Sequence, residues 1–146
     1  MNKTDTMTLL DLYNMLLEAE RAGVTVLNEL VQQVEEDRLT AALKKFLRDE
    51  GANCRVLMNL IHDIGQTPSD KTGAFVGKVR ALENLDEKIQ LLIRGQAWVA
   101  RKIQEFHNLV PAGSPYLFLE AIKMQHEENV GALQKYVEAQ KELKSD

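Results

Sequence analysis

The sequence is poor in the residues that build disulfide-bonded, zinc-clustered or turn-rich proteins. Its 146 residues include one cysteine, three prolines and eight glycines, and only 5% are aromatic. A single cysteine, Cys54, excludes an intramolecular disulfide and a cysteine-cluster zinc site. The scarcity of proline and glycine disfavours an all-β fold with many turns. The length is that of one domain, so we predict a single all-α domain over residues 1–146.

Charge and hydropathy exclude further classes of protein. The 18 Lys and Arg are outnumbered by 22 Asp and Glu, for a formal net charge of -4. Binding to nucleic acid through its phosphates usually needs a basic excess, which is missing here. No apolar run has the length that spans a membrane, and the first residues lack the apolar core of a signal peptide. We therefore expect a cytoplasmic protein that binds neither nucleic acid nor membranes.

Start and stop signals divide the chain into helices. They predict four long helices, at about residues 8–34, 37–64, 84–109 and 114–143. Thr8 with Asp11 three positions later has the pattern of a capping box, and Asp37, Asn84 and Ser114 are further N-cap candidates. Gly65 suits the end of the second helix.

The connection between the second and third helices is the longest. Residues 65–84 are too many for a tight turn between helices, and they can span the length of a helical bundle when extended. A short helix or turn is expected within residues 74–82. The other connections are short. The prediction is therefore two antiparallel helical hairpins joined by a long crossover, which is the ferritin-like topology of a four-helix bundle.

Each predicted long helix carries an apolar stripe that a polar residue interrupts near its middle. The interruptions are Glu20, Glu50, Gln96 and His126, each twelve or thirteen residues after a helix start. At 1.5 Å per residue they lie roughly 18–20 Å into their helices, so they should meet in one layer of the core. A buried unpaired carboxylate costs several kcal/mol. These side chains must therefore satisfy one another, hold water or bind something.

These residues belong to segments with a recognisable pattern: Leu17-Glu18-Ala19-Glu20-Arg21-Ala22-Gly23, Arg48-Asp49-Glu50, Arg94-Gly95-Gln96-Ala97-Trp98 and His126-Glu127-Glu128-Asn129. Over about residues 8–142 the chain resembles the ferritin-like superfamily, in particular the rubrerythrin and bacterioferritin-type bundles. The strings are most similar to a bacterial ferritin-like family of unknown function. The superfamily's di-iron site takes one Glu from each of two helices and a Glu-x-x-His from each of the other two.

The resemblance implies a site that is only partly kept. Three of its six ligand positions hold a ligand of the expected type: Glu20, Glu50 and His126. The other three hold Asn53, Gln96 and Lys123. We expect these residues and Asn129 to form a polar core layer in which Lys123 acts as a counter-ion to the carboxylates.

Two hypotheses for function follow from this layer. In the preferred one, the protein is a non-catalytic binding or interaction protein of the ferritin-like type with a degenerate core site, no cofactor and no catalytic residue. Its ligand is not specified, and a homodimer is expected. In the alternative, Glu20, Glu50 and His126 hold one or two ions of iron, manganese or zinc, with redox or oxidase activity; Asn53 or Gln96 would help through a carbonyl oxygen. An inward Lys123 or Arg94 would argue against the metal.

Two further residues carry weaker expectations. Cys54 lies in the apolar stripe one turn after Glu50, where a free cysteine behaves as a small hydrophobic residue. Trp98 lies one position off the stripe of its helix, which suits the flank of the bundle or a subunit interface.

Overall fold

The computed structural model of the protein describes residues 6–144, and over this range the chain is helical without any strand. The long helices are α1 (Leu9–Gln33), α2 (Asp37–Asp63), α4 (Leu85–Phe106) and α5 (Ser114–Lys144). Two short helices, α3 (Phe75–Arg80) and the 3₁₀ helix η2 (His107–Leu109), lie between them. None of the described helices combines the length and the apolar character that crossing a membrane requires.

The predicted helix starts at Thr8 and Asn84 are confirmed. The Thr8 hydroxyl accepts a hydrogen bond from the amide of Asp11 at 3.0 Å, and the Asp11 carboxylate accepts one from the amide of Thr8 at 3.2 Å. The Asn84 side chain caps α4 by accepting from the amide of Glu87 at 3.2 Å. Each cap satisfies a backbone N–H that has no partner inside the helix.

The predicted starts of α2 at residue 37 and of α5 at residue 114 are also confirmed, but the residues predicted to cap them and the end of α4 were wrong. Glu36, not Asp37, caps α2, because its carboxylate accepts from the amides of Arg38 and Leu39 at 3.0 and 2.7 Å. Ser114 is not the cap of α5 but lies inside its first turn, since the Gly113 carbonyl already accepts from the amide of Leu117. The α-helical part of α4 ends at Phe106, after which the chain tightens into η2.

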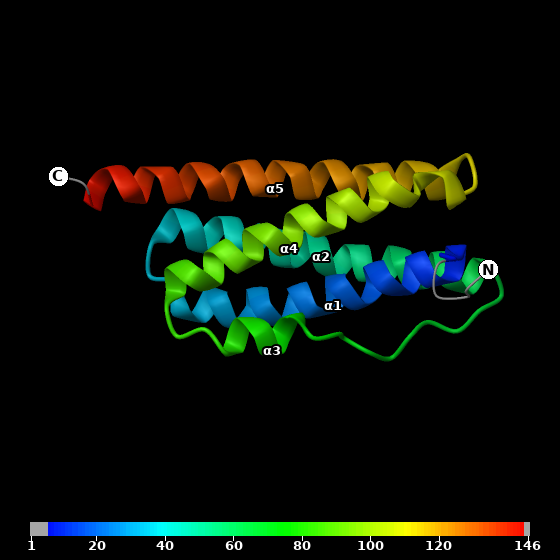
Figure 1. Ribbon diagram of the computed structural model, residues 1–146, viewed down its shortest axis with the longest axis horizontal. Coiled ribbons are helices and arrows are strands. Elements are labelled where there is room, and N and C mark those ends of the chain that lie inside the picture. The colour runs from blue at the N-terminus through cyan, green and yellow to red at the C-terminus, as the bar shows by residue number, and fades with distance from the viewer. Residues whose placement is uncertain (1–5, 145–146) are drawn as a thin grey trace.

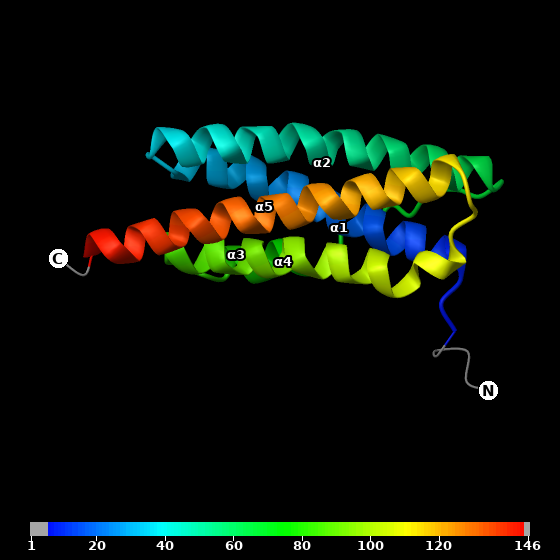
Figure 2. The same ribbon diagram turned by 90° about the horizontal axis from the view of Figure 1, so that it is seen from above.

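The long helices form two antiparallel pairs. α1 and α2 run side by side in opposite directions, and so do α4 and α5, while α2 and α4 run the same way (Figures 1 and 2). The segment from residue 64 to 84 therefore returns along most of the length of the molecule, beside α1, and contains α3 (Figure 1). The long connection and the short helix within it follow the course that the sequence predicts.

Polar contacts fasten this return segment to α1. The Asn14 side chain accepts a hydrogen bond from the amide of Ser69 at 2.9 Å. About two turns further along α1, the Arg21 guanidinium donates to the carbonyls of Ser69 and Lys71. On the other side, the ring of Phe75 lies against the backbone of α4 at Gly95, where a Cβ would stand 2.8 Å from the ring. The segment thus has a defined path between α1 and α4.

The apolar core is divided into two halves. One half is built around Leu12, Leu57, Ile61, Ile103 and Leu119, and the other around Leu27, Leu43, Ile89, Leu92 and Leu133. Six polar side chains are buried among the described residues: Glu20, Glu50, Asn53, Gln96, His126 and Asn129.

Candidate functional site

The first part of the polar layer is a chain of hydrogen bonds from α5 through α4 to α2. The Asn129 amide donates to Oε1 of Gln96 at 3.1 Å, and Nε2 of Gln96 donates to Oε2 of Glu50 at 3.0 Å. All three side chains are buried. Because an amide both donates and accepts, Gln96 links the helix pair α4 and α5 to the helix pair α1 and α2.

The second part of the layer centres on Glu20. Nε2 of His126 lies 2.7 Å from Oε1 of Glu20, and both side chains are fully buried. Oε2 of Glu20 accepts from Nδ2 of Asn53 at 2.9 Å, and the same amide group donates to Gln125 at 2.7 Å. Nδ1 of His126 lies 2.8 Å from the carbonyl oxygen of Ile122 and must donate to it, because a carbonyl only accepts. One proton between Nε2 and Oε1 therefore satisfies both of these atoms, which otherwise have no hydrogen-bond partner.

The charges of the layer compensate one another. Burial alone would lower the pKa of His126, but the charge of Glu20, its hydrogen bond and the Ile122 carbonyl outweigh burial and raise it. His126 is therefore favoured as an imidazolium that neutralises Glu20. Burial, followed by repulsion from Glu20, raises the pKa of Glu50 well above its usual range despite the hydrogen bond from Gln96. Both shifts act to reduce the net negative charge of the buried layer.

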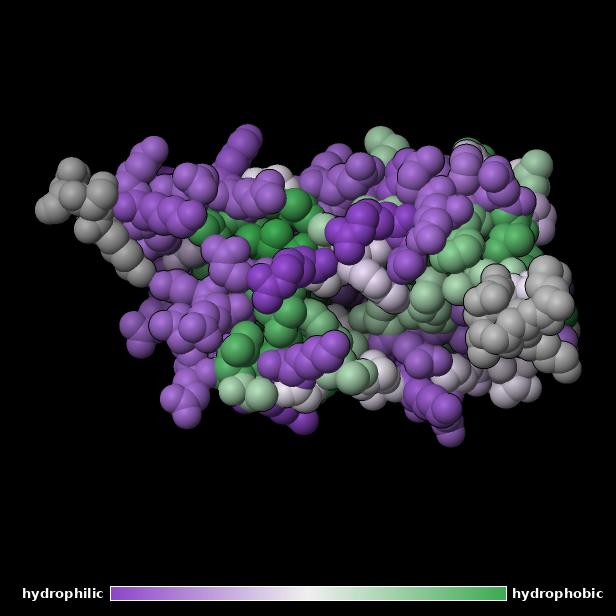
Figure 3. All heavy atoms as spheres, in the orientation of Figure 1, coloured by the Kyte–Doolittle hydropathy of each residue, from purple (hydrophilic) through white to green (hydrophobic). Residues whose placement is uncertain are grey.

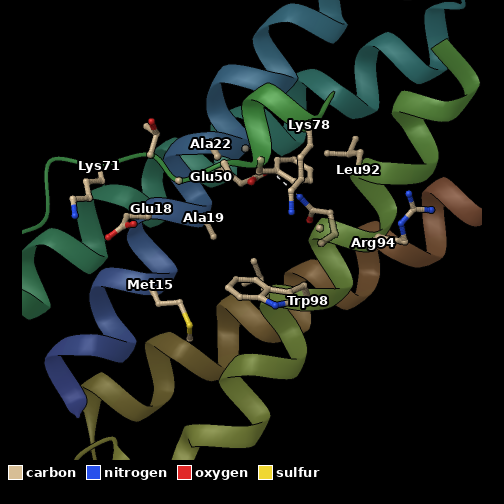
Figure 4. Close-up of a pocket in the computed structure, with 18 of the residues that line it drawn as sticks. Met15, Glu18, Ala19, Ala22, Glu50, Lys71, Lys78, Leu92, Arg94 and Trp98 are labelled. Atoms are coloured by element: carbon tan, nitrogen blue, oxygen red, sulfur yellow. Dashed lines mark hydrogen bonds between the residues drawn. The ribbon is translucent and has the colours of Figure 1, made fainter. Parts of the chain in front are cut away.

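The expectation that Lys123 faces this layer was wrong. Its ammonium group donates to Gln104 at 2.7 Å and pairs with Glu120 at 3.1 Å, so it points toward the outer flank of α4 and α5. Residue 123 precedes His126 by less than one turn, and a long side chain at the edge of the apolar stripe can carry its charge toward water. Arg94 is exposed and also points away from Glu50 (Figure 4).

Above Glu50 lies a cleft with a volume of about 830 Å³. Its walls come from α1, from α4 and from the return segment with α3, and its floor includes Glu50 and Gln96. The Trp98 indole lies opposite Glu50 across the cleft (Figure 4). On this face of the molecule, hydrophobic atoms are visible between hydrophilic side chains around the middle (Figure 3). The volume falls within the range of ligand pockets, roughly 300–1,000 Å³.

A glycine in α1 opens the layer to this cleft. A Cβ on Gly23 would stand 2.0 Å from Oε1 of Glu50, so any larger residue would occupy the place of the carboxyl group. Oε2 of Glu50 accepts the hydrogen bond from Gln96, whereas Oε1 is the oxygen that lies against Gly23. Since Glu50 and Gly23 both line the cleft, the Glu50 carboxyl is the point at which the buried layer meets it.

The layer also contains a cluster of metal-type ligands. One ligand atom from each of Glu20, Glu50 and His126 lies within 4.8 Å of the other two. Asn53 and Gln96, however, direct their N–H groups, and not their carbonyl oxygens, at the carboxylates. The three-residue set fits a single ion, while the donor arrangement around it does not fit the two ions of the full ferritin-like site.

The remaining candidate residues have structural roles. Cys54 lies in the apolar core, and burial, followed by the charge of Glu20, raises the pKa of its thiol to about 11. Trp98 is half-buried against the same half of the core, with the ammonium of Lys102 6.0 Å from its ring. It therefore lies on the flank of the helices and in the wall of the cleft.

Fold and site together define an all-helical protein whose core is split by a compensated polar layer that reaches a cleft. A family model described as a domain of unknown function (DUF6306) matches residues 7–135, so the chain belongs to that family. The comparisons with curated proteins and with solved structures give no match. The family description assigns no activity to this chain.

Sequence reasoning missed the residues that make the cleft. Gly23 and Gly95 interrupt the interiors of two helices, where each glycine costs about 1 kcal/mol relative to alanine and usually has a packing reason. The presence of these two glycines, despite that cost, was the sequence signal for close packing at both positions. No pattern marked Gln125, which lies beside His126 but off the apolar stripe, as a partner of Asn53.

Proposed function

We propose that this protein is a four-helix bundle of the ferritin-like type that binds a small molecule without catalysing its conversion. Support for the bundle comes from two antiparallel helix pairs, the long return segment between them, and the polar residues that each long helix contributes at mid-depth. The superfamily resemblance of the sequence points the same way. The expected homodimer and cytoplasmic location remain predictions.

One observation carries the binding role: a cleft of about 830 Å³ ends on the buried Glu50 carboxyl, which Gln96 holds through its other oxygen, Oε2. Pockets that bind small molecules are mostly apolar with a few fixed polar groups. Here Gln96 holds the Glu50 carboxyl in place from behind, and Gly23 leaves it uncovered. The other polar groups of the layer are hydrogen-bonded to one another. The Glu50 carboxyl can therefore contact a ligand without breaking hydrogen bonds in the core.

The single tryptophan provides the test, because Trp98 lines the cleft. We would titrate a library of small, soluble compounds and follow the indole N–H signal of Trp98 by NMR. We expect a subset of compounds to shift this signal in a saturable manner. If no compound shifts it, the proposal is refuted.

A blocking variant assigns the binding to the cleft. Ala19→Leu adds three carbons to the α1 wall and should abolish the shifts. Ala41→Leu makes the same change at an exposed position on α2, outside the cleft lining, and should leave them intact. Shifts that survive Ala19→Leu would place the compounds elsewhere and contradict the proposal.

A single metal ion is the second candidate, favoured by the three ligand atoms within 4.8 Å and by the outward Lys123. Glu20, Glu50 and His126 would hold the ion. To bind it, His126 and Glu20 would release their shared proton and Glu50 would also have to be deprotonated, since metal binding requires the neutral imidazole and the carboxylates.

Elemental analysis decides between the two candidates. The protein is purified without a histidine tag or chelator and then incubated with ferrous iron. On the binding proposal we expect less than stoichiometric metal before and after. About one ion per chain, absent from His126→Ala and present in the surface variant His62→Ala, would support the metal candidate instead.

A further inference from the structure

The rim of the cleft carries charge of the opposite sign to the whole chain. Four basic residues line the cleft, Lys71, Lys78, Arg94 and Arg101, against three acidic residues: Asp11 and Glu18, and Glu50 on the floor. The chain as a whole has a formal net charge of -4. A local excess of cations on an acidic protein favours an anionic ligand at this place.

Much of this positive charge is available to a ligand. The ion pairs found within residues 6–144 use other cations, including Lys45, Arg80 and Lys102, and none of the four at the rim. Of the acidic groups Asp11 and Glu18, Asp11 is occupied in the capping box of α1, where its carboxylate accepts from the amide of Thr8. Lys71 and Lys78 line the cleft from the return segment and α3, and Arg94 lines it from α4 with its guanidinium directed away from Glu50 (Figure 4).

The interior of the cleft is apolar between this rim and its polar floor. Met15 and Ala22 contribute from α1, Phe75 from α3, and Leu92 and Trp98 from α4. Gly95 lets the Phe75 ring lie against α4, so the aromatic wall is set by close packing of α3 on α4. An apolar body of a ligand would therefore be buried between side chains whose positions are already fixed.

We propose that the cleft binds a small amphipathic organic anion, such as a carboxylate with an aliphatic or aromatic ring. The ring lies against Phe75 and Trp98, the anionic group faces the basic rim, and a polar atom can reach the Glu50 carboxyl on the floor. This inference rests on the proposed binding function and specifies the class of ligand.

The test compares two probes that differ in the charged group: cyclohexylacetate and its neutral counterpart 2-cyclohexylethanol. Affinities are measured from the Trp98 indole signal at low ionic strength. Exposed ion pairs are weak, so we expect the carboxylate to bind about 3-fold to 10-fold more tightly than the alcohol. The preference should shrink as salt is added.

Matched charge variants show whether the rim causes this preference. Lys71→Gln, Lys78→Gln and Arg94→Gln are combined in one protein, and we expect its preference for the carboxylate to disappear while the alcohol binds as before. A control combines Lys44→Gln, Arg55→Gln and Lys135→Gln. These positions are exposed and lie outside the cleft lining, and the net charge changes by the same amount. The control should keep the preference.

The outcomes separate this inference from the proposed function. Equal affinity for the two probes in the wild type overturns the inference but leaves a binding cleft. Loss of the preference in the control as well as in the rim variant also overturns it, because net charge alone would then explain the effect. Failure of both probes, together with a silent Trp98 signal across the compound library, overturns the inference and the proposed function together.

Discussion

The effect of Gly23→Ala on the free energy of unfolding should depend on whether residue 50 is glutamate or alanine. In a helix interior, exchanging glycine for alanine stabilises by about 1 kcal/mol through backbone entropy. In the wild type, however, the new Cβ would stand 2.0 Å from Oε1 and 3.0 Å from Cδ of Glu50. The carboxyl must then leave its place and lose the hydrogen bond from Gln96. A buried polar group without its partner costs about 1–3 kcal/mol.

The net effect in the wild type is therefore zero to about 2 kcal/mol of destabilisation, given these opposing terms. In a Glu50→Ala background the clash is gone, and Gly23→Ala should stabilise by about 1 kcal/mol. The coupling between the two positions is thus about 1–3 kcal/mol, within the range seen for residues in contact. Equilibrium unfolding in guanidinium chloride, followed by circular dichroism, measures all four corners of the cycle.

Gly131 in α5 provides the matched control. It is also a glycine inside a helix, but a Cβ there would meet nothing within 4 Å. Gly131→Ala should give the same stabilisation in the wild type and in Glu50→Ala. If Gly23→Ala stabilised both backgrounds equally, the Glu50 carboxyl would not lie against Gly23, and the account of the cleft floor would be refuted.

Three further predictions concern the buried ionisable groups. Because the pKa of Glu50 is raised, the folded chain keeps a proton that the unfolded chain loses above about pH 4.5. The free energy of unfolding should therefore fall as the pH rises, by up to about 1.4 kcal/mol per pH unit for this group. Glu50→Gln should show a shallower fall in denaturation midpoints, and equal slopes would contradict the assignment. His126→Ala leaves Glu20 buried without its counter-ion and should lower the free energy of unfolding by about 3–5 kcal/mol. Adding Glu20→Gln should then cost less than the sum of the two single effects, and full additivity would mean that the two residues do not pair. The Cys54 thiol, with its pKa near 11, should react with a disulfide reagent at pH 8 only as fast as the protein unfolds, and fast labelling of the native state would be inconsistent with its burial.

The polar layer could be predicted from the sequence because helix caps and apolar stripes are patterns of residues close together in the chain. Caps such as Thr8 and Asn84 mark where helices begin, and the apolar stripes give the phase of each helix. Counting residues from the caps placed Glu20, Glu50, Gln96 and His126 at similar depth, and the structure brings them together with Asn53 and Asn129. Because burying charged groups is costly, four polar residues at the same depth in four helices indicated a functional or structural layer.

Lys123 shows where such counting fails. A helical wheel places a Cα but not the end of a side chain with four methylene groups. Lys123 starts near the apolar stripe and ends on Gln104 and Glu120, because an ammonium group gains hydration and a partner at the surface. The layer needs no such counter-ion, since His126 already neutralises Glu20.

The cleft could not be predicted because it depends on contacts between distant parts of the chain. Its shape follows from the spacing of α1 and α4 and from the path of the return segment, which Asn14 and Arg21 hold. Neither spacing nor path is encoded in a periodic pattern. The local sequence signals for the cleft were Gly23 and Gly95, which are glycines in helix interiors where alanine would be more stable.

The most direct test of the central claim is a crystal structure of the protein with the compound that shifts the Trp98 signal most. The account predicts the ligand between α1 and α4, in contact with Phe75 and Trp98 and reaching the Glu50 carboxyl, with Glu20 and His126 still paired beneath it. A ligand bound elsewhere, or a metal ion separating His126 from Glu20 while the cleft stays empty, would contradict the account.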